Sequence, residues 1–110
     1  MSQSFAQMLA GVRTFHEKHD FAGNNGHDMA YRLLLTMEEL GELAECITKG
    51  KPQVERAEEL ADLLILTLGH AIAMGVDLEA AFDAKLAEVM QRPAIRGDLG
   101  VRVTRYEPPA

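Results

Sequence analysis

The sequence predicts an all-α fold: a four-helix protomer with a short irregular or extended tail at its C-terminus. Two observations predict it. Apolar residues recur at helical spacing in four segments of the 110-residue chain, and residues that break helices separate these segments. Because no repeat or linker interrupts the chain, we expect one helical domain over residues 1–92 and a tail over residues 93–110.

The first two helices are delimited by capping and breaking residues. Ser4 stands where an N-cap belongs and predicts a helix over about residues 5–19. A Gly-Asn-Asn-Gly segment then breaks the chain. Asp28 predicts the start of a second helix, which runs to about residue 49 and ends before Gly50.

The last two helices follow the same logic. The third is predicted over residues 53–74 and stops at Gly75. Asp77 is a suitable N-cap for a fourth helix over about residues 78–91, which Pro93 closes. The short connection around residues 50–52 predicts that the second and third helices pack antiparallel.

The third helix is apolar nearly all the way round between Leu60 and Met74. Such a helix is typically buried on every side, whereas a surface helix shows one apolar stripe. Three neighbouring helices of this length can hardly cover it. We therefore predict that the protomer completes its bundle as a homodimer or homotetramer.

Charge and cysteine content narrow the function classes. The 17 acidic and 11 basic residues give a net charge of −6, which argues against nucleic acid as a partner. The single cysteine, Cys46, fits a reducing cytoplasm. The N-terminus lacks a signal-peptide pattern, and the apolar stretch at residues 60–74 is shorter than the roughly 20 residues that a membrane span needs. We expect a cytoplasmic protein without a membrane partner.

Acidic residues gather in the second and third predicted helices. Glu39 and Glu42 are three residues apart and share one helix face, and Glu59 and Asp62 repeat this spacing on the next helix. Glu42 lies eight residues before Gly50, and Glu59 lies nine residues after it. The two pairs are therefore expected to face each other across an antiparallel helix pair.

Four carboxylates in one place repel one another and resist ionisation. Mg²⁺, with Mn²⁺ as a substitute, resolves this repulsion, because a hard cation takes oxygen ligands and bridges to substrate phosphates. Asp62 is the most informative member, because apolar residues flank it and an unpaired buried carboxylate is costly. The alternative is a solvated acidic helix face. We favour that alternative for four neighbouring acids, Glu38, Glu45, Glu55 and Glu58.

Two ordered motifs, ExxE at residues 39–42 and ExxD at residues 59–62, resemble the signature of the MazG-like all-α nucleoside triphosphate pyrophosphohydrolases. The resemblance covers roughly residues 28–92. It implies a helical protomer that dimerises or forms a dimer of dimers. It also implies that Mg²⁺ is held by the matching residues Glu39, Glu42, Glu59 and Asp62.

The resemblance implies an enzyme, a hydrolase that acts on acid anhydrides. The expected reaction converts a nucleoside or deoxynucleoside triphosphate and water to the monophosphate and pyrophosphate, with cleaning of the nucleotide pool as a role. Glu39 or Glu42 is expected to position or deprotonate the attacking water. Lys85 matches a family lysine that contacts phosphate. Arg92 is expected to assist, with an exposed helix-end arginine as the alternative interpretation.

Two further residues are assigned to substrate binding. Phe21 and His27 precede the second helix, where related proteins place groups that contact the base or the phosphates. Packing is the alternative role for Phe21, and a solvated loop position is the alternative for His27. Val89 and Leu66 depart from the pattern, because some family members carry an asparagine and a tyrosine there. Both departures concern the identity of the nucleotide rather than the metal site.

Two alternatives to this function stay open. The first is a related pyrophosphohydrolase that acts on phosphoribosyl-ATP, which differs in substrate and not in chemistry. The second is a non-catalytic helical module for dimerisation or regulation, in which the acidic cluster is solvated or binds metal for stability. Mg²⁺-dependent release of pyrophosphate separates the enzymes from the module.

Overall fold

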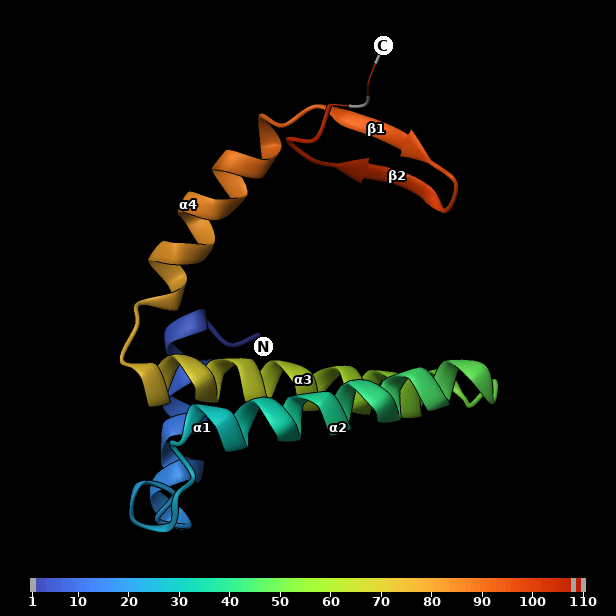
Figure 1. Cartoon of the computed structure of the whole chain (residues 1–110). Coiled ribbons are helices and arrows are strands. Elements are labelled where there is room, and N and C mark those ends of the chain that lie inside the picture. The colour runs from blue at the N-terminus through green and yellow to red at the C-terminus, as the bar shows by residue number, and fades with distance from the viewer. Residues whose placement is uncertain (1, 108, 110) are drawn as a thin grey trace. The chain divides into compact units, whose positions relative to one another are not determined.

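The computed structural model describes residues 2–107 and 109, and the described chain contains four α-helices in the predicted order (Figure 1). A single 3₁₀ turn, Ala22–Asn24, follows the first of them. The all-α prediction is confirmed, with bounds within about two residues of those expected. The helices are α1 (Phe5–Lys18), α2 (Met29–Thr48), α3 (Gln53–Met74) and α4 (Leu78–Met90).

Side-chain caps start three of the helices, at the residues that the sequence predicts. The Ser4 hydroxyl accepts from the backbone N–H of Gln7, whose side chain accepts in turn from the backbone N–H of Ser4, and this forms a capping box. The carboxylates of Asp28 and Asp77 each accept from a backbone N–H three residues on, at 2.8 Å and 3.0 Å. Gly75 ends α3 in the left-handed conformation, with a φ of 67°, which a glycine adopts without strain.

The chain divides into two units between Val76 and Asp77. In the first unit, α2 and α3 lie side by side and antiparallel, and α1 packs against α3 (Figure 1). The domain boundary predicted from the sequence, between residues 92 and 93, stays a prediction. Among the described helices, no single one is long and apolar enough to cross a membrane, and only α3 and α4 taken together reach the required hydropathy.

The buried centre of the first unit lies where α1, α2 and α3 meet. It contains two polar side chains, His16 at 4% exposure and Arg32 at 2%, beside the apolar residues Val12, Leu68 and Ala71. Gly69 makes room for the polar pair. A Cβ at this position would lie 2.2 Å from Arg32 Nη2 and 2.8 Å from His16 Nε2.

Asp62 is less buried than its sequence neighbours predicted. The apolar neighbours of Asp62 predicted a buried carboxylate, but Asp62 is exposed in the single chain. The leucines two positions away on either side are exposed as well, with Leu60 at 59% and Leu64 at 46%. The reason is that α1 and α2 leave part of the α3 surface uncovered, so apolar flanks do not by themselves bury a residue.

The second unit contains α4 and a β-hairpin. The predicted extended piece of the tail is an antiparallel pair of strands, β1 (Ala94–Gly97) and β2 (Gly100–Val103). Ala94 pairs with Val103 at the open end and Gly97 with Gly100 at the turn. Two residues, Asp98 and Leu99, form the turn.

Candidate metal centre and its surroundings

The structure brings the four predicted carboxylates together on facing helices. Glu39 and Glu42 come from α2, and Glu59 and Asp62 come from α3. One carboxylate oxygen from each residue can be chosen so that all four lie within 4.8 Å of one another. The i, i+3 spacing places each pair on one helix face, and the antiparallel packing places the two faces opposite each other. We call this group the carboxylate cluster.

Two oxygens of the cluster are buried without any hydrogen-bond partner. They are Oε2 of Glu39 and Oε2 of Glu59. Burial raises the pKa of Glu39 to about 7, and the nearby charges of Glu42 and Asp62 add to this shift. Burial likewise raises the pKa of Glu59, with further contributions from Glu42 and Asp62. The cluster is therefore a place where negative charge is disfavoured unless a cation is present.

These features fit a divalent cation. Buried carboxylate oxygens without a donor are rare, and each needs a partner such as an ion. Four oxygens this close offer the all-oxygen ligand set that hard cations such as Mg²⁺ prefer. The cluster can therefore hold a metal ion through Glu39, Glu42, Glu59 and Asp62.

An apolar cavity of about 660 Å³ opens beside the cluster and shares two of its residues, Glu39 and Asp62. Helix α1 supplies one wall, including Val12 and Phe15. Phe15 was not predicted to lie at this position. The helical spacing of the apolar residues of α1 predicted that Phe15 lies on the inner face of that helix. It did not predict that this face lines a cavity next to the carboxylate cluster.

Phe21 and His27 do not line this cavity. The Phe21 ring lies 4.5 Å from the His16 ring and 5.2 Å from the Phe15 ring, centroid to centroid. Nε2 of His27 lies 3.0 Å from Nδ1 of His16, so one of these two nitrogens donates to the other. His27 also borders a smaller cavity of about 250 Å³, together with Arg13 and other residues of α1. The placement of Phe21 matches the packing role that the sequence left open.

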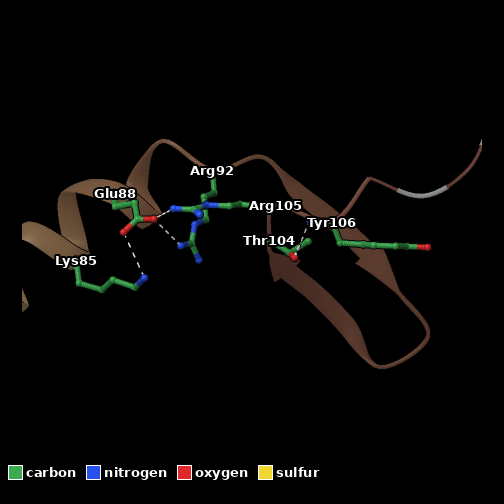
Figure 2. Close-up of polar contacts among 6 residues, drawn as sticks. All are labelled: Lys85, Glu88, Arg92, Thr104, Arg105 and Tyr106. Carbon is green, nitrogen blue, oxygen red and sulfur yellow. Dashed lines mark hydrogen bonds and ion pairs between the residues drawn. The ribbon is translucent and has the colours of Figure 1, made fainter.

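Lys85 and Arg92 lie in the second unit, where both pair with Glu88 (Figure 2). Nζ of Lys85 lies 3.2 Å from Oε2 of Glu88, and Nη2 of Arg92 lies 2.8 Å from Oε1. Arg105, which follows β2, contacts the same Oε1. Three cations thus share one carboxylate, which leaves this group with a net positive charge. Arg105 was not predicted to join this group, because nothing in the sequence shows that the chain after the hairpin returns to α4.

The chain matches the family model of phosphoribosyl-ATP pyrophosphohydrolase over residues 5–88. This match covers well over half of the 110 residues. The chain belongs to the phosphoribosyl-ATP pyrophosphohydrolase family. Neither a curated protein nor a solved structure matches the chain.

Members of the phosphoribosyl-ATP pyrophosphohydrolase family are metal-dependent hydrolases of acid anhydrides, and the family is part of the MazG-like all-α superfamily that the two motifs resemble. The helical fold of the chain is consistent with this family. The matched segment contains the whole carboxylate cluster and Lys85, whereas Arg92 lies beyond it. The family thus supports pyrophosphohydrolase activity on phosphoribosyl-ATP or related nucleotides.

Proposed function

We propose that this protein is a Mg²⁺-dependent pyrophosphohydrolase that cleaves a nucleotide between its α- and β-phosphates. The observation that carries the proposal is the carboxylate cluster, with its two buried oxygens that lack a hydrogen-bond partner. A fully solvated acidic face would not bury two carboxylate oxygens, because burying an unpaired carboxylate is costly.

Glu39, Glu42, Glu59 and Asp62 would hold the cation. When bound, Mg²⁺ supplies charge neutralisation and polarises the phosphate oxygens. Glu39 or Glu42 positions the attacking water or takes its proton. Water adds to one of the two bridged phosphorus atoms, the bridging P–O bond breaks, and pyrophosphate leaves as the second product. No covalent nucleophile is needed, because positioning and electrostatics carry most of phosphoryl transfer.

The apolar cavity beside the cluster is our candidate for the base and sugar of the nucleotide. It is wide enough for them at about 660 Å³, and two of its residues belong to the cluster. Lys85 and Arg92 remain proposed phosphate contacts, supported by the excess positive charge around Glu88. Phe21 and His27 remain weaker proposals, because they lie outside this cavity.

Phosphoribosyl-ATP is the candidate substrate that the family match favours, and ordinary nucleoside and deoxynucleoside triphosphates are the others. With the latter, the enzyme would clean the nucleotide pool. Either substrate contains the same triphosphate, so the chemistry at the cluster is the same. We place the reaction in the cytoplasm and expect the active form to be a homodimer or homotetramer, in line with the exposed apolar residues of α2 and α3.

The test is release of pyrophosphate from a panel of substrates, with and without Mg²⁺. The panel contains phosphoribosyl-ATP, the four nucleoside triphosphates and the four deoxynucleoside triphosphates. We expect at least one member to yield its monophosphate and pyrophosphate only when Mg²⁺ or Mn²⁺ is present. A chain that releases pyrophosphate from none of them is a non-catalytic helical module instead.

A further inference from the structure

Arg32 is a buried cation without an acidic partner. Its side chain is 2% exposed, and no described carboxylate forms an ion pair with it. Its guanidinium instead donates to three neutral acceptors: Nε to Nδ1 of His70 at 2.9 Å, Nη1 to the Gly26 carbonyl at 2.9 Å, and Nη2 to the Leu66 carbonyl at 3.2 Å. Buried charges are usually paired with opposite charges, so this arrangement calls for an explanation.

The hydrogen-bond directions follow from Arg32. Arginine nitrogens only donate, so Nδ1 of His70 must be an unprotonated acceptor and its proton must be on Nε2. Nε2 therefore donates to the Thr36 hydroxyl at 2.8 Å, and that hydroxyl donates to the backbone carbonyl of Arg32 at 2.9 Å. The result is a closed ring of three hydrogen bonds, which we call the Arg32–His70–Thr36 ring. Burial and the neighbouring Arg32 charge lower the pKa of His70, which keeps it neutral as the ring requires.

The ring lies next to the carboxylate cluster along both helices. On α2, Thr36 is one turn from Arg32, and Glu39 follows three residues later on the same face. On α3, steps of four residues lead from His70 through Leu66 to Asp62. The ring therefore lies about one turn from the cluster along α2 and about two turns from it along α3.

Arg32 and Thr36 together make every described side-chain hydrogen bond between α2 and α3. Two come from Arg32 to His70 and Leu66, and the third joins Thr36 to His70. The cluster has the opposite effect, because four carboxylates on facing helices push the helices apart. Hydrogen bonds from Arg32 and Thr36 thus stabilise the α2–α3 contact against the repulsion between the four carboxylates.

We propose that Arg32, Thr36 and His70 are positioning residues, which fix α2 against α3 at the spacing where the four carboxylates share one cation. This inference rests on the metal site of the proposed function. It adds a role for residues that belong neither to the carboxylate cluster nor to the lining of the apolar cavity beside it.

The test compares Mn²⁺ binding by variants at Thr36, measured by electron paramagnetic resonance of free Mn²⁺ without nucleotide. Thr36→Val keeps the shape of the side chain but leaves Nε2–H of His70 without an acceptor. We expect it to weaken Mn²⁺ binding about tenfold, the lower end of the loss typical for residues that orient metal ligands. Thr36→Ser restores the hydroxyl and should bind within about twofold of wild type.

Thr67→Val is the matched control. Its hydroxyl also donates to a carbonyl four residues earlier, that of Leu63 at 2.8 Å, but it lies on an exposed part of α3. It should leave Mn²⁺ binding unchanged. Circular dichroism shows whether each variant folds, and Thr36→Ala replaces Thr36→Val if the added methyl group prevents folding. The nitrogen chemical shifts of His70 should show a proton on Nε2 and none on Nδ1.

Wild-type affinity in Thr36→Val, or a proton on Nδ1 of His70, overturns the proposal. A wild-type chain that binds no Mn²⁺ overturns it together with the metal site. If Thr36→Val weakens Mn²⁺ binding while wild type releases no pyrophosphate from any nucleotide, the positioning role stands and the proposed reaction fails. The two failures are therefore distinguishable.

Discussion

At the scale of single residues, Glu39 shows how a proton would compete with a metal ion for the cluster. Its pKa of about 7 results first from burial and then from the neighbouring carboxylates Glu42 and Asp62. Near neutral pH it holds a proton for much of the time, and a metal ion must displace that proton to bind. Its usual pKa, 4.5, would leave it ionised over the whole physiological range.

Mn²⁺ affinity should therefore rise by about tenfold between pH 6 and pH 8 and level off above, as expected for a ligand that ionises near pH 7. Without metal, the raised pKa of Glu39 also makes the free energy of unfolding depend on pH. Because the pKa of Glu39 is raised in the folded state, its contribution to stability is present below pH 4.5 and is lost as pH rises towards 7. Titration of Mn²⁺ at several pH values checks the first expectation. Glu38→Gln, which removes an exposed acid beside the cluster, should keep the pH dependence, and a flat affinity in both chains contradicts this account.

Residue spacing predicted which carboxylates lie together, because a helix has a fixed period and the loop before α3 is short. It did not predict that Asp62 is exposed, because exposure depends on which surfaces of α3 the other helices cover. Nor did it predict the contacts of Arg32 and His70. These residues lie 38 positions apart, and no local pattern reports a hydrogen bond over that distance.

At the scale of elements, the junction of α1, α2 and α3 depends on Gly69. Its missing side chain lets α3 approach His16 and Arg32, and Arg32 cannot retreat without losing hydrogen bonds. Gly69→Ala should therefore lower the free energy of unfolding by about 1–3 kcal/mol, as overpacking does. Gly41 is the matched control, because it also lies within a helix but faces open space.

Gly41→Ala should raise the free energy of unfolding by up to about 1 kcal/mol, because alanine favours helix more than glycine does. Urea denaturation of both variants measures the two values. Equal effects of the two substitutions would show that the close contact at Gly69 is not important for stability.

Helix positions were predictable because caps and breakers are local. Ser4, Asp28 and Asp77 each accept the backbone hydrogen bond that their positions predict. The hairpin was less predictable. The tail was expected to be irregular or extended, but the pairing of β1 with β2 depends on a two-residue turn that carries only a weak signal in Asp98 and Leu99.

At the scale of the whole molecule, the first unit by itself leaves a large apolar surface exposed on α2 and α3. Met37 is 69% exposed, Leu34 62% and Leu60 59%. Surfaces of this kind typically mark an interface. We expect the protein to sediment as a homodimer or homotetramer.

Leu34→Glu should shift the sedimentation equilibrium towards the monomer, because a charge would be buried in the interface. Glu55→Gln, a change at an exposed acidic residue, should leave the assembly intact. A wild-type chain that sediments as a monomer at micromolar concentration contradicts the proposed assembly.

The most direct test of the central claim is Mg²⁺-dependent pyrophosphate release by Asp62→Asn, compared with Glu58→Gln. Asp62 belongs to the carboxylate cluster, whereas Glu58 is an exposed acid on the same helix outside it. We predict that Asp62→Asn keeps its helical content but that its turnover falls by about a hundredfold or more. Removal of a residue that only orients a metal ligand already costs about 10- to 100-fold, and Asp62 is itself a proposed ligand. Glu58→Gln should retain wild-type turnover. Undiminished turnover in Asp62→Asn would contradict the assignment of the carboxylate cluster as the catalytic metal site.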